Sequence, residues 1–257
     1  MVAGIKRFRD HFAGHEEQYV LIGGAACELI MDEVGLDFRA TKDLDIVLIV
    51  EALGPAFSET FWSFIEEGDY EIRQRSEGDR ILYRFQKPSK DDFPAMIELF
   101  SRTPKELNIA EGSALTPLPI DEEAASLSAI LLDEDYYAFL KSMVRGVDGI
   151  PLLDERGIIP FKAKAWLDLS ARRETGEKVD ERDIKKHRND VARLLQLLPA
   201  DTQYSLPDSV RDDMANFVAA LDAADDFDPK SFHVDMTREA VVDRLKDAYG
   251  LWTTHPV

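Results

Sequence analysis

The stretch YVLIGGAACELIMDEVGLDFRATKDLDIVLIV, residues 19–50, decides the fold of the chain. Its apolar start at 19–22 predicts a strand, the residues after the glycines predict a helix over about 24–34, and DIVLIV predicts a second, largely buried strand. Gly23 and Gly24 stand where the first strand turns into the helix. A tight turn favours glycine because glycine accepts positive φ, and the bare N–H groups of a helix start also suit a phosphate. From these residues alone, both explanations of the glycine pair are open.

The neighbouring sequence extends this pattern into a sheet. Helices are predicted over about 4–17 and 55–67, and the alternating segment around Gly78 predicts a β-hairpin. PAMIELFSR, at 94–102, predicts another short strand. Elements in this order predict the α+β class, with a twisted mixed β-sheet flanked by helices.

The rest of the chain predicts a mainly helical C-terminal part. A proline-bearing stretch, EGSALTPLPIDEE, leads out of the sheet region, and we expect one domain over 1–118 and a second over 119–257. SLSAILLD, at 126–133, predicts one more strand. Pro160 suits the first turn of the helix that it opens, and Gly176 suits the end of the same helix. Five helices are expected, at about 136–145, 160–174, 180–198, 207–222 and 236–248.

The composition is acidic, with 50 aspartates and glutamates against 31 lysines and arginines and a formal net charge of -19. This balance opposes broad attraction to nucleic acid, which depends on basic side chains that neutralise phosphates. It leaves room for a local basic groove, and it also fits a basic partner or bound metal cations. The run ERDIKKHRND, at 181–190, predicts either such a basic patch or a solvated helix with internal ion pairs.

The expected compartment is the cytoplasm. The chain contains no uninterrupted apolar run of the ~18 residues that would suggest a membrane span, so no membrane partner is expected. Its first residues lack the apolar block of a secretory signal. Its single cysteine, Cys27, rules out an internal disulfide, which fits a reducing compartment.

Two carboxylates mark the head of the second strand. Asp43 and Asp45 flank Leu44, and because side chains alternate along a strand, both acids project to one side while Leu44 faces the other. Two adjacent acids repel each other and need a compensating cation, and Mg²⁺ takes oxygen ligands of this kind. Solvated aspartates at a polar strand end are the alternative.

A third acid lies on another predicted strand. Glu98 interrupts the apolar run AMIELF, in a segment that we expect to pair near the Asp43 strand. A lone acid there is costly unless it is satisfied. Three carboxylates on neighbouring strands would hold two Mg²⁺ ions roughly 4 Å apart, the spacing used in phosphoryl transfer. On this hypothesis the glycines that receive phosphate and the acids that hold metal belong to one site.

These residues resemble those of a known family. GGAACELIMDEVGLDFRATKDLDIVL is similar to the DNA polymerase β-like nucleotidyltransferase superfamily, which carries Gly-Gly or Gly-Ser on a strand–helix turn and Asp-x-Asp on the next strand. The Arg-x-Thr-x-Asp-x-Asp form, from Arg39 to Asp45, most resembles the abortive-infection nucleotidyltransferase toxins of the AbiEii/AbiGii type. IIPFKAKAWLDLSARRETGEKVDERDIKKHRNDVARL resembles their downstream helical part, and the likeness covers about residues 15–200. It implies a nucleotidyltransferase-like sheet.

The resemblance implies a role for each matching residue. Gly23 and Gly24 would bind the triphosphate of a nucleoside triphosphate (NTP) substrate, and Asp43 and Asp45 would hold both Mg²⁺ ions. Glu98 would complete the metal site and act as base toward the acceptor hydroxyl. The family often has aspartate at the position of Glu98.

Four further residues are candidates for contact with the nucleotide. Thr41 and Lys42 lie beside the acids, and Lys42 would either contact phosphate or neutralise the acidic cluster. Lys162 and Lys164 stand early in a predicted helix, and the resemblance favours one of them as a triphosphate contact without choosing between them. Surface lysines, with Lys164 paired to Asp168 at i,i+4, are the alternative.

The implied reaction is nucleotidyl transfer, in which an acceptor hydroxyl attacks the α-phosphorus of an NTP and pyrophosphate leaves. The acceptor would be RNA or a protein, and the chain would be the toxin-like part of a bacterial toxin–antitoxin or phage-defence system, with a cognate antitoxin as partner. Two other functions compete with this one. They are a small-molecule nucleotidyltransferase of the antibiotic type and a non-catalytic interaction module derived from the same fold.

Overall fold

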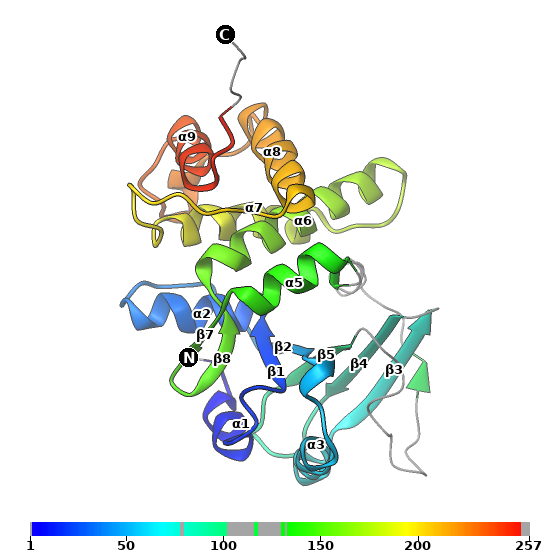
Figure 1. Cartoon of the computed structure of the whole chain (residues 1–257). Coiled ribbons are helices and arrows are strands. Elements are labelled where there is room, and N and C mark those ends of the chain that lie inside the picture. The colour runs from blue at the N-terminus through cyan, green and yellow to red at the C-terminus, as the bar shows by residue number, and fades with distance from the viewer. Residues whose placement is uncertain (1, 78–79, 102–115, 118–129, 132, 253–257) are drawn as a thin grey trace. The chain divides into compact units, whose positions relative to one another are not determined.

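The computed structural model describes residues 2–77, 80–101, 116–117, 130–131 and 133–252. The chain divides into two compact units (Figure 1). The sheet unit comprises Met1–Leu132 and Val144–Asp154, and the helical unit comprises Asp133–Met143 and Glu155–Val257. The predicted α+β class, with a mixed sheet flanked by helices and a mainly helical C-terminal part, is confirmed.

The sheet unit contains every helix and strand predicted between residues 4 and 102. Its helices are α1 (Ile5–His11), α2 (Gly23–Glu33), the 3-10 helix η1 (Val50–Ala52) and α3 (Pro55–Gly68). Its strands are β1 (Tyr19–Ile22), β2 (Asp43–Leu48), β3 (Glu71–Glu77), β4 (Arg80–Gln86), β5 (Met96–Ser101), β6 (Thr116–Pro117), β7 (Val144–Val147) and β8 (Ile150–Leu153). α1 ends earlier than predicted, and Gly14 just beyond it has a φ of +89°, which a right-handed helix does not allow.

The eight strands form one mixed sheet in the order β6-β3-β4-β5-β2-β1-β8-β7. β2 runs antiparallel to β1 and parallel to β5, and β4 runs antiparallel to β5. The predicted pairing between the Asp43 strand and the Glu98 strand is therefore confirmed. β2 lies inside the sheet, with β1 on one side and β5 on the other.

One face of the sheet carries an aromatic core supplied by α1 and α3. Phe8 of α1 contacts Tyr19 of β1 and Phe64 of α3, with ring centroids 5.5 and 5.6 Å apart. Phe61 of α3 contacts Phe85 of β4 at 5.3 Å. Rings packed edge to face in this way bury large apolar areas and hold both helices against one side of the sheet.

The acids lie on the other face. In the strand register, Tyr19 pairs with Leu48, whereas Ile22 pairs with Asp45 and Asp45 pairs with Glu98. Tyr19 and Ile22 are three residues apart on one strand, so their side chains point to opposite faces. Asp45 and Glu98 therefore project from the face opposite the aromatic core.

The β7–β8 hairpin is absent from the sequence predictions. The predicted helix at 136–145 runs too far, because α5 (Glu134–Ser142) ends before β7 begins at Val144. The two strands are joined by Asp148 and Gly149, which both have positive φ, at 49° and 79°. Asp-Gly with this backbone is typical of a tight hairpin turn, which also fits the antiparallel pairing of β7 with β8.

The strand predicted at 126–133 falls mostly outside the described residues. The structure describes Ile130, Leu131 and Asp133 of this segment, and the first two are helical. The strand prediction is wrong at these two residues. A short apolar run does not by itself separate a strand from a buried helix.

The helical unit contains each of the five helices that the sequence predicts. They are α5, α6 (Glu155–Glu174), α7 (Glu181–Leu195), α8 (Asp208–Asp222) and α9 (Arg238–Tyr249), with the 3-10 helix η2 (Pro229–Phe232) before α9. Over the part of the chain that the structure describes, no helix combines the length and the apolar character needed to cross a membrane.

Pro160 does not begin its helix as predicted. α6 begins at Glu155, so Pro160 lies inside it. Proline lacks the N–H that would bond to the carbonyl of Arg156 four residues earlier. The Tyr249 hydroxyl of α9 donates to this carbonyl oxygen at 3.0 Å, which satisfies the acceptor and lets the helix continue.

Gly23 opens α2 with a φ of +69°, the left-handed conformation that the steric explanation of the glycine pair requires. A Cβ atom at this position would lie 1.8 Å from Oδ2 of Asp45. Gly35, just beyond α2, has a similar φ of +74°, but a Cβ there would meet nothing within 4 Å. Substitutions at the two glycines would therefore share the cost of backbone strain, and only a substitution at Gly23 would also meet the Asp45 carboxylate.

Replacing these two glycines tests the fit between the turn and Asp45. Gly35→Ala is expected to lower the free energy of unfolding by about 1–2 kcal/mol, because alanine disfavours positive φ. Gly23→Ala is expected to cost at least about 2 kcal/mol more, since the Asp45 carboxylate must also move. Urea unfolding at 25 °C measures both losses.

The double variant Gly23→Ala/Asp45→Ala supplies the control. Removing the carboxylate is expected to relieve the conflict and to return the cost of Gly23→Ala to that of Gly35→Ala. Equal losses for both single variants would show that Asp45 does not constrain the turn.

Candidate functional site

Asp43 and Asp45 have the alternation that the sequence predicts. Both aspartates are partly exposed, while Leu44 between them is fully buried. Both carboxylates therefore project from one face of β2, at the strand end that follows the loop from α2.

Asp45 is one member of a row of charged side chains that crosses three neighbouring strands. Asp45 of β2 is the register partner of Glu98 on β5, and Glu98 is the register partner of Arg84 on β4. Register partners point to the same face of a sheet, and adjacent strands lie about 4.8 Å apart. We call Asp45, Glu98 and Arg84 the charged row.

Arg84 binds the carboxylate of Glu98. Its Nε donates to Glu98 Oε1 at 2.6 Å, and its Nη2 forms an ion pair with the same oxygen. Arg84 is 9% exposed and Glu98 6% exposed, so the pair is buried and each charge offsets the desolvation cost of the other. The sequence does not predict this partner, because the strand order decides which residue lies beside Glu98.

Asp45 lies against the glycine turn. Besides the 1.8 Å approach to Oδ2, a Cβ on Gly23 would lie 2.7 Å from Cγ of Asp45. The carboxylate thus fills the space that a side chain at residue 23 would need, at the N-terminus of α2, where the helix dipole favours negative charge. The structure brings the glycine turn and the Asp-x-Asp strand together, as the sequence predicts.

Thr41 lies beside the second glycine. A Cβ on Gly24 would lie 3.0 Å from Oγ1 of Thr41 and 3.5 Å from Nη2 of Arg39. The backbone N–H of Thr41 donates to Oε2 of Glu28 on α2 at 3.3 Å, so α2 also holds the loop that leads to β2. Lys42, the next residue, is exposed.

The three carboxylates that the sequence predicts as metal ligands lie on the neighbouring strands β2 and β5. Within the described ranges, no group of three or more histidine, cysteine, aspartate or glutamate side chains is arranged to hold a metal ion. The charged row gives the reason: Asp45 lies against Gly23 on the β1 side, whereas Glu98 is bound by Arg84 on the β4 side. The three carboxylates nevertheless fit Mg²⁺, which prefers carboxylate oxygens as ligands. Gly23 has no side chain that would cover the carboxylate of Asp45.

Both predicted lysines are ion-paired inside the helical unit. Lys162 of α6 is 4% exposed, and its Nζ donates to Oδ2 of the fully buried Asp190 on α7 at 3.1 Å. Nζ of Lys164 donates to Oδ1 of Asp213 on α8 at 3.0 Å. The partner of Lys164 is thus Asp213, and the alternative pairing with Asp168 was wrong.

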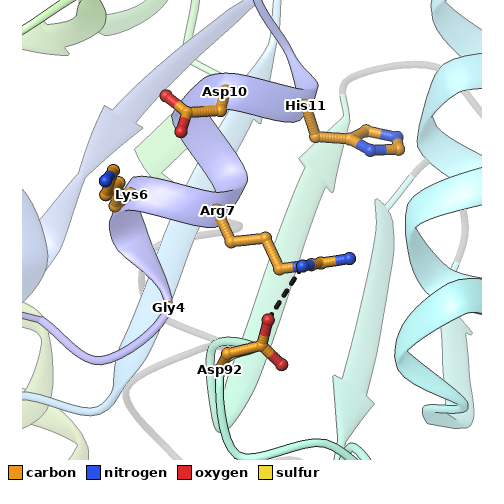
Figure 2. A pocket seen from close by; sticks show the side chains of 6 residues that line it. All are labelled: Gly4, Lys6, Arg7, Asp10, His11 and Asp92. Atoms are coloured by element: carbon orange, nitrogen blue, oxygen red, sulfur yellow. Dashed lines mark hydrogen bonds and ion pairs between the residues drawn. The ribbon is translucent and has the colours of Figure 1, made fainter.

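Hollows lined by described residues include one in each unit, and these two contain no predicted site residue. The first, of about 510 Å³, lies in the sheet unit and is lined by Gly4, Lys6, Arg7, Asp10, His11 and Asp92. Figure 2 shows Arg7 extending from α1 to Asp92, with which it forms a 2.8 Å ion pair. The second, of about 430 Å³, lies in the helical unit between α6 and α7, where Trp166, Lys185, Arg188 and Asp226 are among the lining residues.

The charge run at 181–190 behaves as a helix with ion pairs. Lys185 pairs with Glu181 at 2.7 Å, and Arg188 pairs with Asp226 at 2.8 Å. The hydrogen bonds from Arg188 lower the pKa of Asp226 to about 2, so this carboxylate stays ionised across the physiological range. The run therefore carries ion pairs, as one of the two alternatives expects, but Arg188 is buried and its partner lies outside the run, so the helix is only partly solvated.

Comparison with known proteins gives distant structural likenesses. No family model matches the chain, and no curated protein matches it. An antigenic nucleotidyltransferase-like protein from Paracoccidioides brasiliensis has a TM-score of 0.43 and 14% identity, over 96% of this chain and 91% of that one. The antibiotic-resistance factor ANT(2'')-Ia has a TM-score of 0.39 and 10% identity, over 86% of this chain and 92% of that one. The Cid1 poly(U) polymerase, in a structure bound to MgATP, has a TM-score of 0.32 and 11% identity, over 95% of this chain and 76% of that one.

These neighbours are nucleotidyltransferases or nucleotidyltransferase-like proteins. At such low identities and TM-scores, the function of this chain has to be inferred from its own residues.

Substitution of the two lysines tests how each ion pair contributes to stability. Lys162→Met is expected to lower the free energy of unfolding by about 3 kcal/mol, because the fully buried Asp190 loses its ammonium partner and keeps the longer 3.3 Å ion pair with Arg193. Lys164→Met is expected to cost about 1 kcal/mol or less, since the pair with Asp213 is partly exposed and Tyr136 still donates to that carboxylate. Guanidinium chloride unfolding measures both.

The double variant Lys162→Met/Asp190→Leu is the control for the buried pair. Replacing both charges by apolar groups is expected to restore much of the stability that Lys162→Met loses. Similar losses for Lys162→Met and Lys164→Met would contradict the structural difference between the two pairs.

Proposed function

We propose that this chain is a metal-dependent nucleotidyltransferase that moves a nucleoside monophosphate from an NTP to a hydroxyl of an RNA or protein acceptor. The observation that carries the proposal is the fit of Asp45 against Gly23. The start of α2, which suits phosphate, lies against Asp45, one of two carboxylates that suit a cation. A Mg²⁺–triphosphate complex needs both kinds of group within a few ångströms.

Within this function, each part of the site has a task. Gly23 and Gly24 would let the triphosphate approach the N-terminus of α2, where N–H groups and the helix dipole attract negative charge. Asp43 and Asp45 would hold two Mg²⁺ ions, and Glu98 would complete the metal site and act as base toward the acceptor hydroxyl. When bound, the ions would polarise the attacking hydroxyl and neutralise charge on the leaving oxygen.

Other residues would position the nucleotide. Thr41 lies next to Gly24 and would contact the triphosphate through its hydroxyl, and the exposed Lys42 would neutralise phosphate charge. Lys162 and Lys164 remain candidates for a further phosphate contact. Lys164 is the more accessible of the two, with a side chain 29% exposed against 5% for Lys162.

A transfer assay tests the proposed reaction. The purified protein is incubated with each α-³²P-labelled NTP, Mg²⁺ and a cell extract, and label is measured in the RNA, protein and small-molecule fractions. The wild type is expected to transfer label to RNA or protein, whereas Asp43→Asn/Asp45→Asn is expected to lose at least about a hundredfold of this activity, because it lacks the metal ligands. Asp32→Asn, an exposed change on α2, is the matched control and is expected to stay active.

The fractions also separate the competing functions. Label confined to the small-molecule fraction would favour the antibiotic-type alternative. The absence of transfer by a folded wild type, with no difference from the double variant, would overturn the proposal and favour the interaction module.

The biological role that we attach to this reaction is that of the toxin in a cytoplasmic toxin–antitoxin or phage-defence pair. Its support is the Arg39-x-Thr41-x-Asp43-x-Asp45 spacing on one loop and strand. Induced expression in bacteria is expected to arrest growth with the wild type and not with Asp45→Asn. Equal growth of both strains at equal protein levels would contradict the toxin role without touching the reaction itself.

A further inference from the structure

The two acids of the charged row have different neighbours. Asp45 lies at the glycine turn, while Glu98, its register partner, is bound by the Arg84 guanidinium through Nε and Nη2. Both contacts fall on a single oxygen, Oε1. Oε1 of Glu98 is therefore directed to Arg84 on β4, while Asp45 on β2 is the register partner of Glu98 on the other side.

We infer that Arg84 is a positioning residue that competes with the metal for Glu98. In this arrangement Arg84 supplies the positive charge that a buried glutamate needs, so the site folds in the absence of metal. Recruitment of Glu98 to the ions held by Asp43 and Asp45 would then weaken its bond to Arg84, because the same carboxylate charge would be shared with the metal. The inference rests on the proposed function for the location of the metal, but the competition itself concerns only this chain and a divalent cation.

Charge and burial both indicate that Arg84 and a metal ion compete for the Glu98 carboxylate. A guanidinium and a divalent ion repel each other, and the repulsion is stronger at a site with little water than in bulk solvent. Arg84 and Glu98 are both more than nine-tenths buried, so the ionised carboxylate is stabilised by a nearby cation. Removing Arg84 therefore takes a cation away from a buried acid, which favours a bound metal ion in its place.

Mn²⁺ binding without nucleotide tests the inference. Free Mn²⁺ is counted by electron paramagnetic resonance during titration of the full chain, for the wild type, Arg84→Met and Arg84→Lys. Arg84→Met is expected to bind Mn²⁺ on the order of tenfold more tightly than the wild type. Arg84→Lys keeps a charge without the planar fork of Arg, so its affinity is expected to fall between the two.

A second readout follows folding directly. The melting temperature of Arg84→Met is expected to lie below that of the wild type without metal, and to rise more on addition of Mn²⁺. In the Glu98→Gln background, Arg84→Met is expected to change neither the Mn²⁺ affinity nor the metal-induced shift. This double variant keeps the test informative if Arg84→Met is poorly folded on its own.

The outcomes separate this inference from the proposed function. Suppose that the wild type binds Mn²⁺ and transfers nucleotide. Weaker or unchanged Mn²⁺ binding by Arg84→Met would then overturn the competition and leave the proposed function intact. If Arg84→Met binds Mn²⁺ more tightly than the wild type, but the wild type transfers no nucleotide, the competition would be supported and the proposed function contradicted. An absence of Mn²⁺ binding by the wild type and by Arg84→Met would overturn the inference.

Discussion

The fit of the Asp45 carboxylate against Gly23 is the constraint on which the candidate site depends. It requires a residue without a side chain at the turn, a positive φ at that residue and the pairing of Ile22 with Asp45 in the β1–β2 register. A slip of one residue in this register would place Leu44 or Ile46 at the turn and send both aspartates into the aromatic core. The same contact therefore specifies the sheet and places an acid at the start of a helix.

Each unit contains a buried acid that is paired with a basic side chain. Glu98 is held by Arg84 between two strands of the sheet unit, and Asp190 is held by Lys162 between two helices of the helical unit. Such pairs add little net stability compared with apolar packing, but each becomes costly when one partner is removed. In the sheet unit, the acid that Arg84 neutralises is the register partner of Asp45, one of the proposed metal ligands.

The sequence predicts the parts of the site that lie close together along the chain. The glycine turn, the alternation of Asp43 and Asp45 around Leu44 and the Asp43–Glu98 strand pairing follow from strand periodicity and are present. Arg84 could not be predicted, because a hairpin alternates identically whichever strand it joins, and only the order β4-β5-β2 brings Arg84 to Glu98. The β7–β8 hairpin was predictable from Asp148-Gly149, whereas the continuation of α6 through Pro160 depends on the distant Tyr249 hydroxyl.

The most direct test of the account is a crystal structure of the chain with Mn²⁺ and a non-hydrolysable NTP, in which the anomalous signal locates the metal. The account requires a Mn²⁺ peak within about 2.2 Å of carboxylate oxygens of Asp43 and Asp45, with the triphosphate over Gly23 and Gly24 at the start of α2. Nucleotide bound elsewhere on the chain, or bound at the turn while both aspartates contact only protein, would contradict it.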